Sequence, residues 1–304
     1  MLIDSVNTYL SVRRRLGFKL KCIERYLLNY AAFATAVGDT HVVGKTAIDW
    51  ASKASSEDSR ARSLDILIRF ARFVRAEDDR HEIPTDNVFC GRWYRRTSYI
   101  FSDQEVAEIL LHAGCLGPPD SLRPHTYKTL FGLLASTGLR ISEALSLRLE
   151  DITSDGLVIR ETKFKKSRIV PLHATVVTAL DSYIERRRQC DRGDNHVFIS
   201  QRGSHGLAYR TVAETFHEVL KAAGIPESKN RSSPRLLDFR HRFAVKALES
   251  CPDSRDRVSR HMLALSTYMG HARVEDTYWY LESTPQLMND IVGVCELFMQ
   301  GDLP

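Results

Sequence analysis

Four segments in the second half of the sequence carry side chains that could together perform phosphoryl transfer. Arg140 lies in TGLRISEALSL, Arg240 lies in LDFRHRFA, a lysine-rich run reads TKFKKSRIVPL, and the last segment runs from Gly270 to Tyr280. Guanidinium groups are permanently charged, forked donors that suit the non-bridging oxygens of a phosphodiester. A tyrosine hydroxyl is a weak nucleophile until a base or cationic neighbours activate it.

Both arginines lie where an oppositely charged partner is expected. Arg140 follows Thr-Gly at the start of a predicted helix, and Arg240 lies within a predicted helix whose adjacent face is apolar. A charge close to an apolar face requires a partner. Glu143 and Asp238 are the predicted carboxylates that hold Arg140 and Arg240 in place. The alternative interpretation is that both arginines are ordinary paired core residues.

In order and content, the four segments resemble the tyrosine recombinase (phage integrase) family over residues 100–300. The resemblance implies a site-specific DNA recombinase, a strand transferase that cleaves and rejoins DNA through a 3′-phosphotyrosine intermediate. The catalytic residues that it implies are Arg140, Lys163, Arg240, His271 and Tyr280. It implies no cofactor and no metal, because arginines and lysine supply the charge stabilisation that metal ions supply elsewhere.

The resemblance selects its residues from close neighbours. Lys163 is implied to protonate the leaving 5′ oxygen, and the lysines two and three positions later remain alternatives. The family spacing selects Tyr280 over Tyr278, in a segment whose aromatic content is also typical of core. His271 can donate to a phosphate oxygen, or it can simply cap the end of a helix.

One position departs from the family pattern. Members of the family usually have histidine, sometimes lysine, three residues before the second arginine, where this sequence has Leu237. Leucine cannot accept the tyrosine proton. Arg235 and His241 are the available neighbours, and His241 lies about one helical turn further on. The departure supports an alternative function, a catalytically weakened DNA-binding relative that acts as an accessory or partner subunit.

Basic residues occur in clusters, two of them interleaved with aromatic residues. The formal net charge of +5 permits nucleic-acid binding without establishing it. A solvated helix face explains a single cluster, whereas several clusters favour a surface that follows DNA phosphates. The residues predicted to bind DNA are Arg13, Arg14, Arg15, Lys19, Arg92, Arg95, Arg96, Lys165, Lys166 and Arg168.

Hydrophobic periodicity predicts a mainly α fold with a small antiparallel β-sheet. Residues 1–80 show helical spacing, and a capping box at Ser102 and Glu105 starts a further helix. Short β-branched runs predict strands at 156–160, 168–172 and 196–200, the first two joined by the lysine-rich hairpin. The later predicted helices are 173–188, 209–222, 237–250, 255–269 and 285–298.

The 304 residues, 43% of them hydrophobic, are sufficient for two domains. We expect a helical core-binding, DNA-binding domain over residues 1–90, a linker over 91–101, and a catalytic tyrosine recombinase domain over 102–304. The resemblance implies double-stranded DNA as partner and a synaptic tetramer on DNA, and it leaves open related recombinase subunits as further partners.

The remaining expectations concern location and biological context. No stretch of about 18 apolar residues is present and the six cysteines are dispersed, so we expect a cytoplasmic, nucleoid-associated protein with no membrane partner. A mobile element is the expected context, with transposition, integration, excision and resolution all open. The rival classes are a helical scaffold protein and a type IB topoisomerase.

Overall fold

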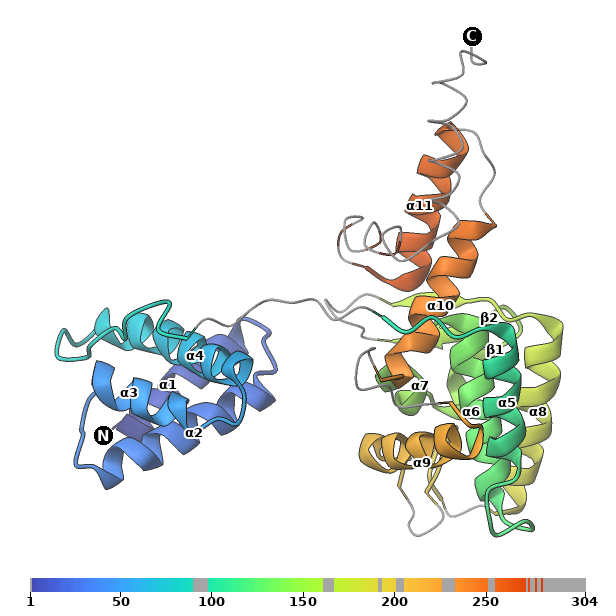
Figure 1. Ribbon diagram of the computed structural model, residues 1–304, viewed down its shortest axis with the longest axis horizontal. Helices are drawn as coiled ribbons and strands as arrows, with labels where there is room; N and C mark the ends of the chain where they lie inside the picture. The colour runs from blue at the N-terminus through green and yellow to red at the C-terminus, as the bar shows by residue number, and fades with distance from the viewer. Residues whose placement is uncertain are drawn as a thin grey trace. The chain divides into compact units, whose positions relative to one another are not determined.

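The computed structural model describes residues 2–89, 98–160, 167–190, 193–200, 205–225, 233–250 and 255–271, together with residues 273, 277 and 280; within 255–258 it describes the backbone alone. The chain divides into two compact units, Met1–Arg95 and Arg96–Pro304 (Figure 1). The predicted fold class is confirmed, since the described elements are mainly helices with one small antiparallel sheet.

The first unit is a helical bundle with its own apolar core. Its helices are α1 (Leu2–Arg15), α2 (Lys21–Ala36), α3 (Gly44–Ser52) and α4 (Glu57–Arg75). Tyr30 and Phe70 are fully buried, and Tyr9 packs edge-on against Phe70 at a centroid distance of 5.6 Å. Ser56 begins α4 because its side chain accepts the backbone N–H of Ser59.

The second unit contains a helical layer, a sheet and two later helices that carry candidate site residues. Its elements are α5 (Asp103–Gly114), α6 (Leu122–Thr137), α7 (Ile141–Ser146), the 3₁₀ helix η1 (Leu149–Asp151), β1 (Ile152–Thr153), β2 (Gly156–Ile159), β3 (Arg168–Val170), α8 (Ala174–Gln189), α9 (Tyr209–Ala222), α10 (Leu236–Glu249) and α11 (Arg255–Met269). Helix α6 lies beside both α5 and α8 (Figure 1).

Aromatic side chains fix α10 against the rest of the second unit. Phe131 of α6, Phe216 of α9 and Phe239 of α10 are buried, and their ring centroids lie 5.4 to 6.2 Å apart. Aromatic pairs at such distances stabilise beyond their buried area. Since Phe239 is anchored in this cluster, the next residue, Arg240, has a defined place at the edge of the core.

The sheet is β1-β2-β3, with Leu157 opposite Val170 and Ile159 opposite Arg168. The predicted strand at 196–200 is wrong, because this segment forms only isolated bridges, from His196 to Arg148 and from Ile199 to Gly206. Its apolar residues are buried in the main core. A short, fully buried run has no period that would distinguish a strand from a core-packed loop.

The other helix predictions agree closely with the structure. Ser102 and Glu105 form the predicted capping box, and the four helices predicted between residues 173 and 269 agree to within one residue at each end. The predicted helix at 285–298 and residues 91–97 of the predicted linker lie outside the described residues.

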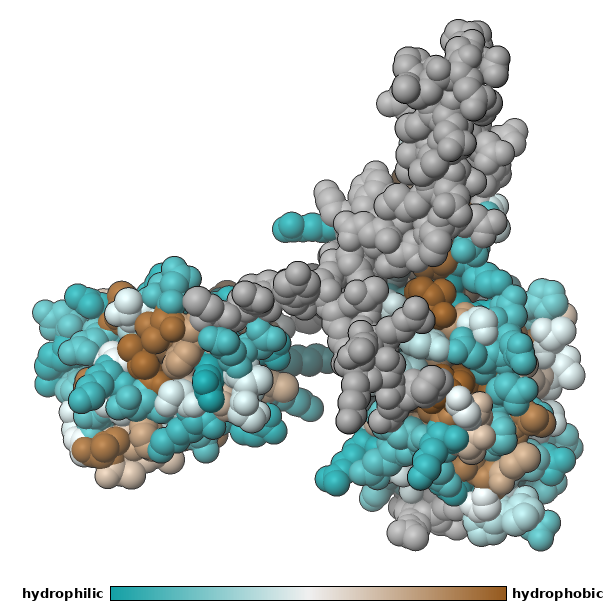
Figure 2. Space-filling view, in the orientation of Figure 1, coloured by the Kyte–Doolittle hydropathy of each residue, from teal (hydrophilic) through white to brown (hydrophobic). Residues whose placement is uncertain are grey.

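The described surface is mostly polar. On the face that Figure 2 shows, hydrophilic residues dominate both units, with hydrophobic residues in separate patches. Among the helices that the structure describes, no helix is both long enough and apolar enough to cross a lipid bilayer. Three cysteines in the described part of the chain, Cys22, Cys115 and Cys190, are exposed free thiols.

Candidate active site

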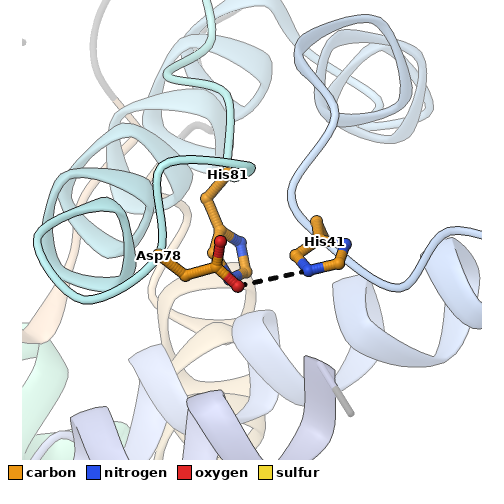
Figure 3. A group of neighbouring side chains, drawn as sticks. All are labelled: His41, Asp78 and His81. Carbon is orange, nitrogen blue, oxygen red and sulfur yellow. Dashed lines mark ion pairs between the residues drawn. The ribbon is translucent and has the colours of Figure 1, made fainter.

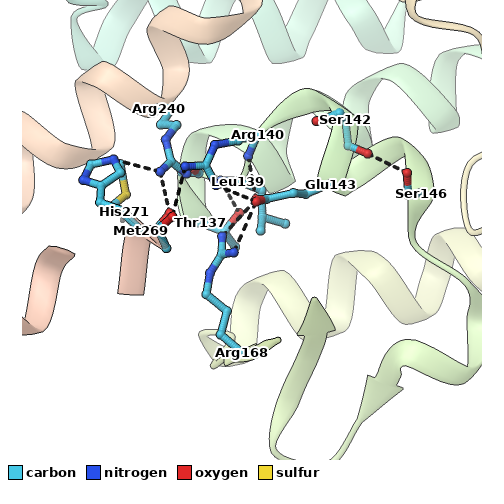
Figure 4. A network of polar contacts seen from close by, with 12 residues as sticks. Thr137, Leu139, Arg140, Ser142, Glu143, Ser146, Arg168, Arg240, Met269 and His271 are labelled. Carbon is cyan, nitrogen blue, oxygen red and sulfur yellow. Dashed lines mark hydrogen bonds and ion pairs between the residues drawn. The ribbon is translucent and has the colours of Figure 1, made fainter. Parts of the chain in front are cut away.

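Arg140 is positioned by the turn between α6 and α7. Gly138 ends α6 with a left-handed φ of 61°, and a Cβ there would lie 2.6 Å from the ring of Phe243, so this turn requires glycine. Arg140 follows as the residue before α7, and its Nη1 donates to Glu143 Oε1 at 2.7 Å (Figure 4). The backbone N–H of Arg140 also donates to Glu143 Oε2, at 3.1 Å.

Arg240 is a buried cation that backbone carbonyls surround. Its side chain is 3% exposed, Nη1 donates to the carbonyl of Gly138 at 2.8 Å, and Nη2 donates to the carbonyl of Met269 at 2.5 Å. Burial, and then the positive charge of Arg140, lower the pKa of Arg240 to about 10, so it remains charged at neutral pH. A buried cation held by neutral acceptors favours the approach of an anion.

The predicted pairing of Asp238 with Arg240 is corrected by the structure. Asp238 accepts the backbone N–H of Arg235 at 2.7 Å and Arg235 Nη2 at 3.2 Å, so it caps the first turn of α10. Residues two apart on a helix do not face each other, which is why Asp238 does not reach Arg240. Burial raises the pKa of Asp238, and the hydrogen bond and charge of Arg235 oppose that shift.

His271 and Tyr280 complete the cluster. Helix α11 ends in a turn at Gly270, whose carbonyl accepts Arg140 Nη2 at 3.2 Å. His271 lies 3.1 Å from Arg240 Nη2 through Nε2, and 2.8 Å from the hydroxyl of Thr277 through Nδ1. Tyr280 is 4% exposed, and its ring stacks on that of His271 with centroids 6.0 Å apart.

His241 and Leu237 occupy different environments on α10. His241 is buried, and its ring lies 5.4 Å from that of Tyr280. Leu237 is 44% exposed in the first turn of the helix. The structure therefore brings the predicted supporting histidine to the tyrosine, whereas the position that departs from the family pattern faces solvent.

Arg168 differs from the other residues predicted to bind DNA, because the structure places it inside the cluster. It begins β3 and forms a bidentate ion pair with Glu143. Nη2 donates to Oε2 at 2.9 Å, and Nη1 donates to Oε1 at 3.2 Å (Figure 4). Burial raises the pKa of Glu143, but hydrogen bonds and charge from Arg168 and then Arg140 outweigh it, so the pKa lies below its ordinary value.

The other predicted DNA-binding residues divide into two groups. Arg92, Arg95, Arg96, Lys165 and Lys166 lie outside the described residues, as does Lys163, which the resemblance implies to be catalytic. Arg13, Arg14, Arg15 and Lys19 lie at the end of α1 and in the turn after it, where Arg14 donates to Glu24 at 2.6 Å. Cations at a helix C-terminus also interact favourably with its dipole, so this cluster has a structural role as well.

Thr277 is a site residue that sequence reasoning did not identify. It is fully buried and contacts Nδ1 of His271 through its hydroxyl. Nothing in its sequence context distinguishes it from an ordinary core threonine. Its contact with His271, six residues earlier in the sequence, is evident only from the structure.

A second group of side chains, in the first unit, consists of residue types that can bind a metal ion (Figure 3). His41 Nε2 lies 3.3 Å from Asp78 Oδ2, and His81 is close to both. However, His81 Nδ1 accepts the backbone N–H of Val42 at 3.0 Å, so in the neutral ring the proton lies on Nε2. In addition, Arg80 donates through Nε and Nη2 to the two carboxylate oxygens of Asp78. The hydrogen bonding thus disfavours a metal at this group.

Known proteins similar to this chain are integrases and recombinases. The phage integrase family matches residues 101–286. Protein y4rB of Sinorhizobium fredii, named as an integrase/recombinase, is 37% identical, with 94% of each chain covered. Tyrosine recombinase XerC of Pseudomonas savastanoi is 30% identical, with 74% of this chain and 69% of XerC covered.

Two solved structures share the fold at low sequence identity. The Tn1549 transposon integrase in complex with transposon right end DNA has a TM-score of 0.64 and 16% identity, with 96% of this chain and 99% of that chain covered. A lambda integrase dimer bound to a COC′ core site has a TM-score of 0.60 and 19% identity, with 93% and 77% covered.

Proposed function

Because the chain belongs to the phage integrase family of tyrosine recombinases, which are DNA strand-transferring enzymes, we propose that it cleaves and rejoins DNA through a 3′-phosphotyrosine bond to Tyr280. One observation carries the proposal. Arg140, Arg240, His271 and Tyr280 come from three separate segments, yet they lie in a single connected network of polar and ring contacts.

The charge of the cluster suits a phosphodiester. Three guanidinium groups, those of Arg140, Arg168 and Arg240, lie around one carboxylate, that of Glu143. Among the described contacts of this group no second carboxylate takes part, since Asp238 is committed to Arg235. An anionic phosphate would therefore offset charge that the protein leaves uncompensated, and the charge that grows on it in the transition state would be stabilised further.

The proposed reaction is an in-line displacement at phosphorus. The hydroxyl oxygen of Tyr280 forms a bond to phosphorus, the bond from phosphorus to the 5′ oxygen breaks, and the phenolic proton passes to a base. The 5′ oxygen leaves with a proton from a general acid, for which the family resemblance selects Lys163. The 5′ hydroxyl of another strand then reverses these steps. The covalent link conserves the phosphodiester energy, so ATP is unnecessary.

The two histidines beside Tyr280 have different proposed roles. Nε2 of His271 accepts an N–H of Arg240, which places its proton on Nδ1, beside Thr277. Both nitrogens of His271 are thus engaged, and this ring orients Arg240 and Tyr280. His241, whose ring lies 5.4 Å from that of Tyr280, is the residue that we assign to take the phenolic proton in place of the histidine missing at Leu237.

The proposed partner is double-stranded DNA from a mobile element. Solved relatives are a transposon integrase with transposon end DNA and a lambda integrase dimer on a core site. By analogy the first unit is the core-binding domain, the second is the catalytic domain, and protomers assemble as a synaptic tetramer, alone or with related recombinases. The basic residues at the end of α1 and in the lysine-rich hairpin would contact DNA phosphates. The proposed process is transposition or integration of the mobile element. Its proposed location is the nucleoid in the cytoplasm.

A second candidate function, a catalytically weakened DNA-binding relative, is favoured by Leu237. An exposed leucine at this position cannot act as a base. If His241 does not replace it, the protein would bind DNA and assist a partner recombinase without efficient cleavage of its own.

Trapping on nicked DNA distinguishes the two functions. A nick close to the scissile phosphate, on the side of its 5′ oxygen, lets the short fragment that carries the free 5′ hydroxyl diffuse away, so the covalent intermediate accumulates. We expect a protein–DNA adduct that survives denaturant and contains a phosphotyrosine at residue 280 by peptide mass spectrometry. Specific DNA binding without any adduct would support the weakened relative instead.

A further inference from the structure

We infer that Arg168 is a positioning residue that holds Glu143, and through it Arg140, in the geometry needed for DNA cleavage. The inference rests on the proposed function and concerns a residue outside the five that the family resemblance selects. A chain of direct contacts joins β3 to the turn before α7.

Arg140 and Arg168 share one carboxylate, that of Glu143. Glu143 Oε1 accepts both Arg140 Nη1, at 2.7 Å, and Arg168 Nη1, at 3.2 Å, while Oε2 accepts Arg168 Nη2, at 2.9 Å. A forked guanidinium fixes a carboxylate in both position and rotation, which a single hydrogen bond does not. Arg140 therefore contacts an oxygen whose place Arg168 determines.

The guanidinium group of Arg168 is committed to Glu143. The side chain of Arg168 is 12% exposed, and both terminal nitrogens already donate to Glu143. Its Nε is buried without a hydrogen-bond partner. The carboxylate of Glu143 compensates the charge of Arg168, whereas Arg240 donates to neutral backbone carbonyls and keeps its charge for an anion. Arg168 therefore acts through Glu143.

Arg168 also packs against the turn before His271. A Cβ at Gly270 would lie 2.8 Å from Arg168 Nη1, so the absence of a side chain there allows the guanidinium to pack against this turn. The carbonyl of the same glycine accepts Arg140 Nη2 at 3.2 Å. Arg168 thus lies where β3, the start of α7 and the end of α11 meet (Figure 4).

Arg168 closely follows the lysine-rich segment in the sequence. It begins β3, two residues after segment 161–166, which contains Lys163. Its pair with Glu143 links the start of this strand to Arg140. The positions of β3 and of Arg140 therefore both depend on the ion pair between Arg168 and Glu143.

The test is a double-mutant cycle of Arg168→Gln and Glu143→Gln, measured as the single-turnover rate of adduct formation on nicked DNA at saturating protein. Misplacement of a catalytic group by about 1 Å can lower the rate about 10²-fold. We expect the rate of adduct formation by Arg168→Gln to fall by about this factor. The DNA affinity of this variant should stay within about twofold of that of wild type. Because both residues act in one chain of contacts, the double variant should be little slower than the slower single variant.

The pH profile gives a readout that a general loss of stability would not produce. Among the described residues, the charged or titratable side chains around Glu143 are Arg140 just before α7, Arg168 on β3 and Arg240 on α10, with His271 beyond Arg240. Without Arg168, burial is opposed by fewer cations and the pKa of Glu143 rises. We expect cleavage by Arg168→Gln to decline on the acid side at a higher pH than cleavage by wild type.

Two further variants complete the experiment. Arg160→Gln removes an arginine–carboxylate pair with Asp151 next to the same sheet and should cleave within about twofold of wild type. Arg168→Lys keeps the positive charge but lacks the forked guanidinium, so it should form the adduct slowly while its melting temperature is unchanged. If Arg168→Gln does not fold, the rate of Arg168→Lys is the test of the inference. A wild-type rate in either folded Arg168 variant, or independent losses that multiply in the cycle, would overturn the inference. Absence of an adduct with the wild-type protein would instead overturn the proposed function.

Discussion

At the scale of single residues, the proton acceptor for Tyr280 is the assignment with the clearest chemical test. We predict that His241→Gln slows single-turnover cleavage by about 10²- to 10⁴-fold, the usual contribution of general acid–base catalysis, while DNA affinity is unchanged. The matched control is His261→Gln, which removes a histidine that contacts the carbonyl of Ala247 away from the tyrosine. A wild-type cleavage rate in His241→Gln would eliminate it as the base.

A histidine at position 237 should compensate for that loss. Leu237 is largely exposed, so Leu237→His should leave the melting temperature close to that of wild type. We predict that it raises the cleavage rate more in the His241→Gln background than in the wild-type background, because only the former lacks a proton acceptor. Equal effects in both backgrounds, measured as single-turnover rates, would mean that the two positions act independently.

The identity of the clustered residues could be predicted from the sequence more fully than their partners could. Arg140, Arg240, His271 and Tyr280 are found in one network, and Glu143 contacts Arg140 as expected. The partner of Arg240 was mispredicted, since a carboxylate nearby in sequence need not face it on a helix. The partner of Arg168 comes from 25 residues away, a distance over which spacing carries no information.

At the scale of elements, the turn between α6 and α7 tests whether backbone geometry positions the arginines. Gly138→Ala would force a side chain into a left-handed conformation against Phe243 and displace the carbonyl that accepts Arg240. We predict a loss of roughly 1–3 kcal/mol in the free energy of unfolding, together with slower cleavage. Thermal or denaturant unfolding and single-turnover assays measure the two effects.

Gly132→Ala is the matched control for that prediction. Gly132 lies within α6, where an added Cβ would meet Leu110 at an ordinary 3.7 Å. The substitution should be neutral or stabilise by up to about 1 kcal/mol, since alanine has the higher helix propensity. If both variants behave alike, the turn has no special role.

The elements themselves show where sequence patterns are sufficient. Helix α9 has the predicted bounds because its apolar stripe faces the core and its other face is polar. Strand β1 was missed because two residues cannot display a period. The segment at 196–200 was mispredicted because all-round burial removes the alternation that identifies a strand. Local patterns thus predict amphipathic elements well and short buried ones poorly.

At the scale of the whole molecule, binding to DNA should be governed by phosphate neutralisation. A protein that contacts roughly six to ten phosphates loses about 10³- to 10⁵-fold in affinity between about 50 and 200 mM salt, and we predict a fall in this range. Lys19→Gln should reduce the slope of log affinity against log salt by about 1. The control Arg69→Gln removes an exposed arginine paired with Asp65 and should leave the slope unchanged. Affinity that hardly varies with salt would contradict the proposed DNA surface.

The central claim, covalent catalysis by Tyr280, is tested most directly by adduct formation in Tyr280→Phe. The variant lacks one oxygen and keeps the buried ring against His271 and His241, so stability and specific DNA binding should remain close to wild type. On nicked DNA we predict that no adduct forms, because phenylalanine has no nucleophile, and that Tyr278→Phe still forms one. An adduct that persists in Tyr280→Phe would contradict the assignment, and its disappearance in Tyr278→Phe would identify Tyr278 as the nucleophile instead.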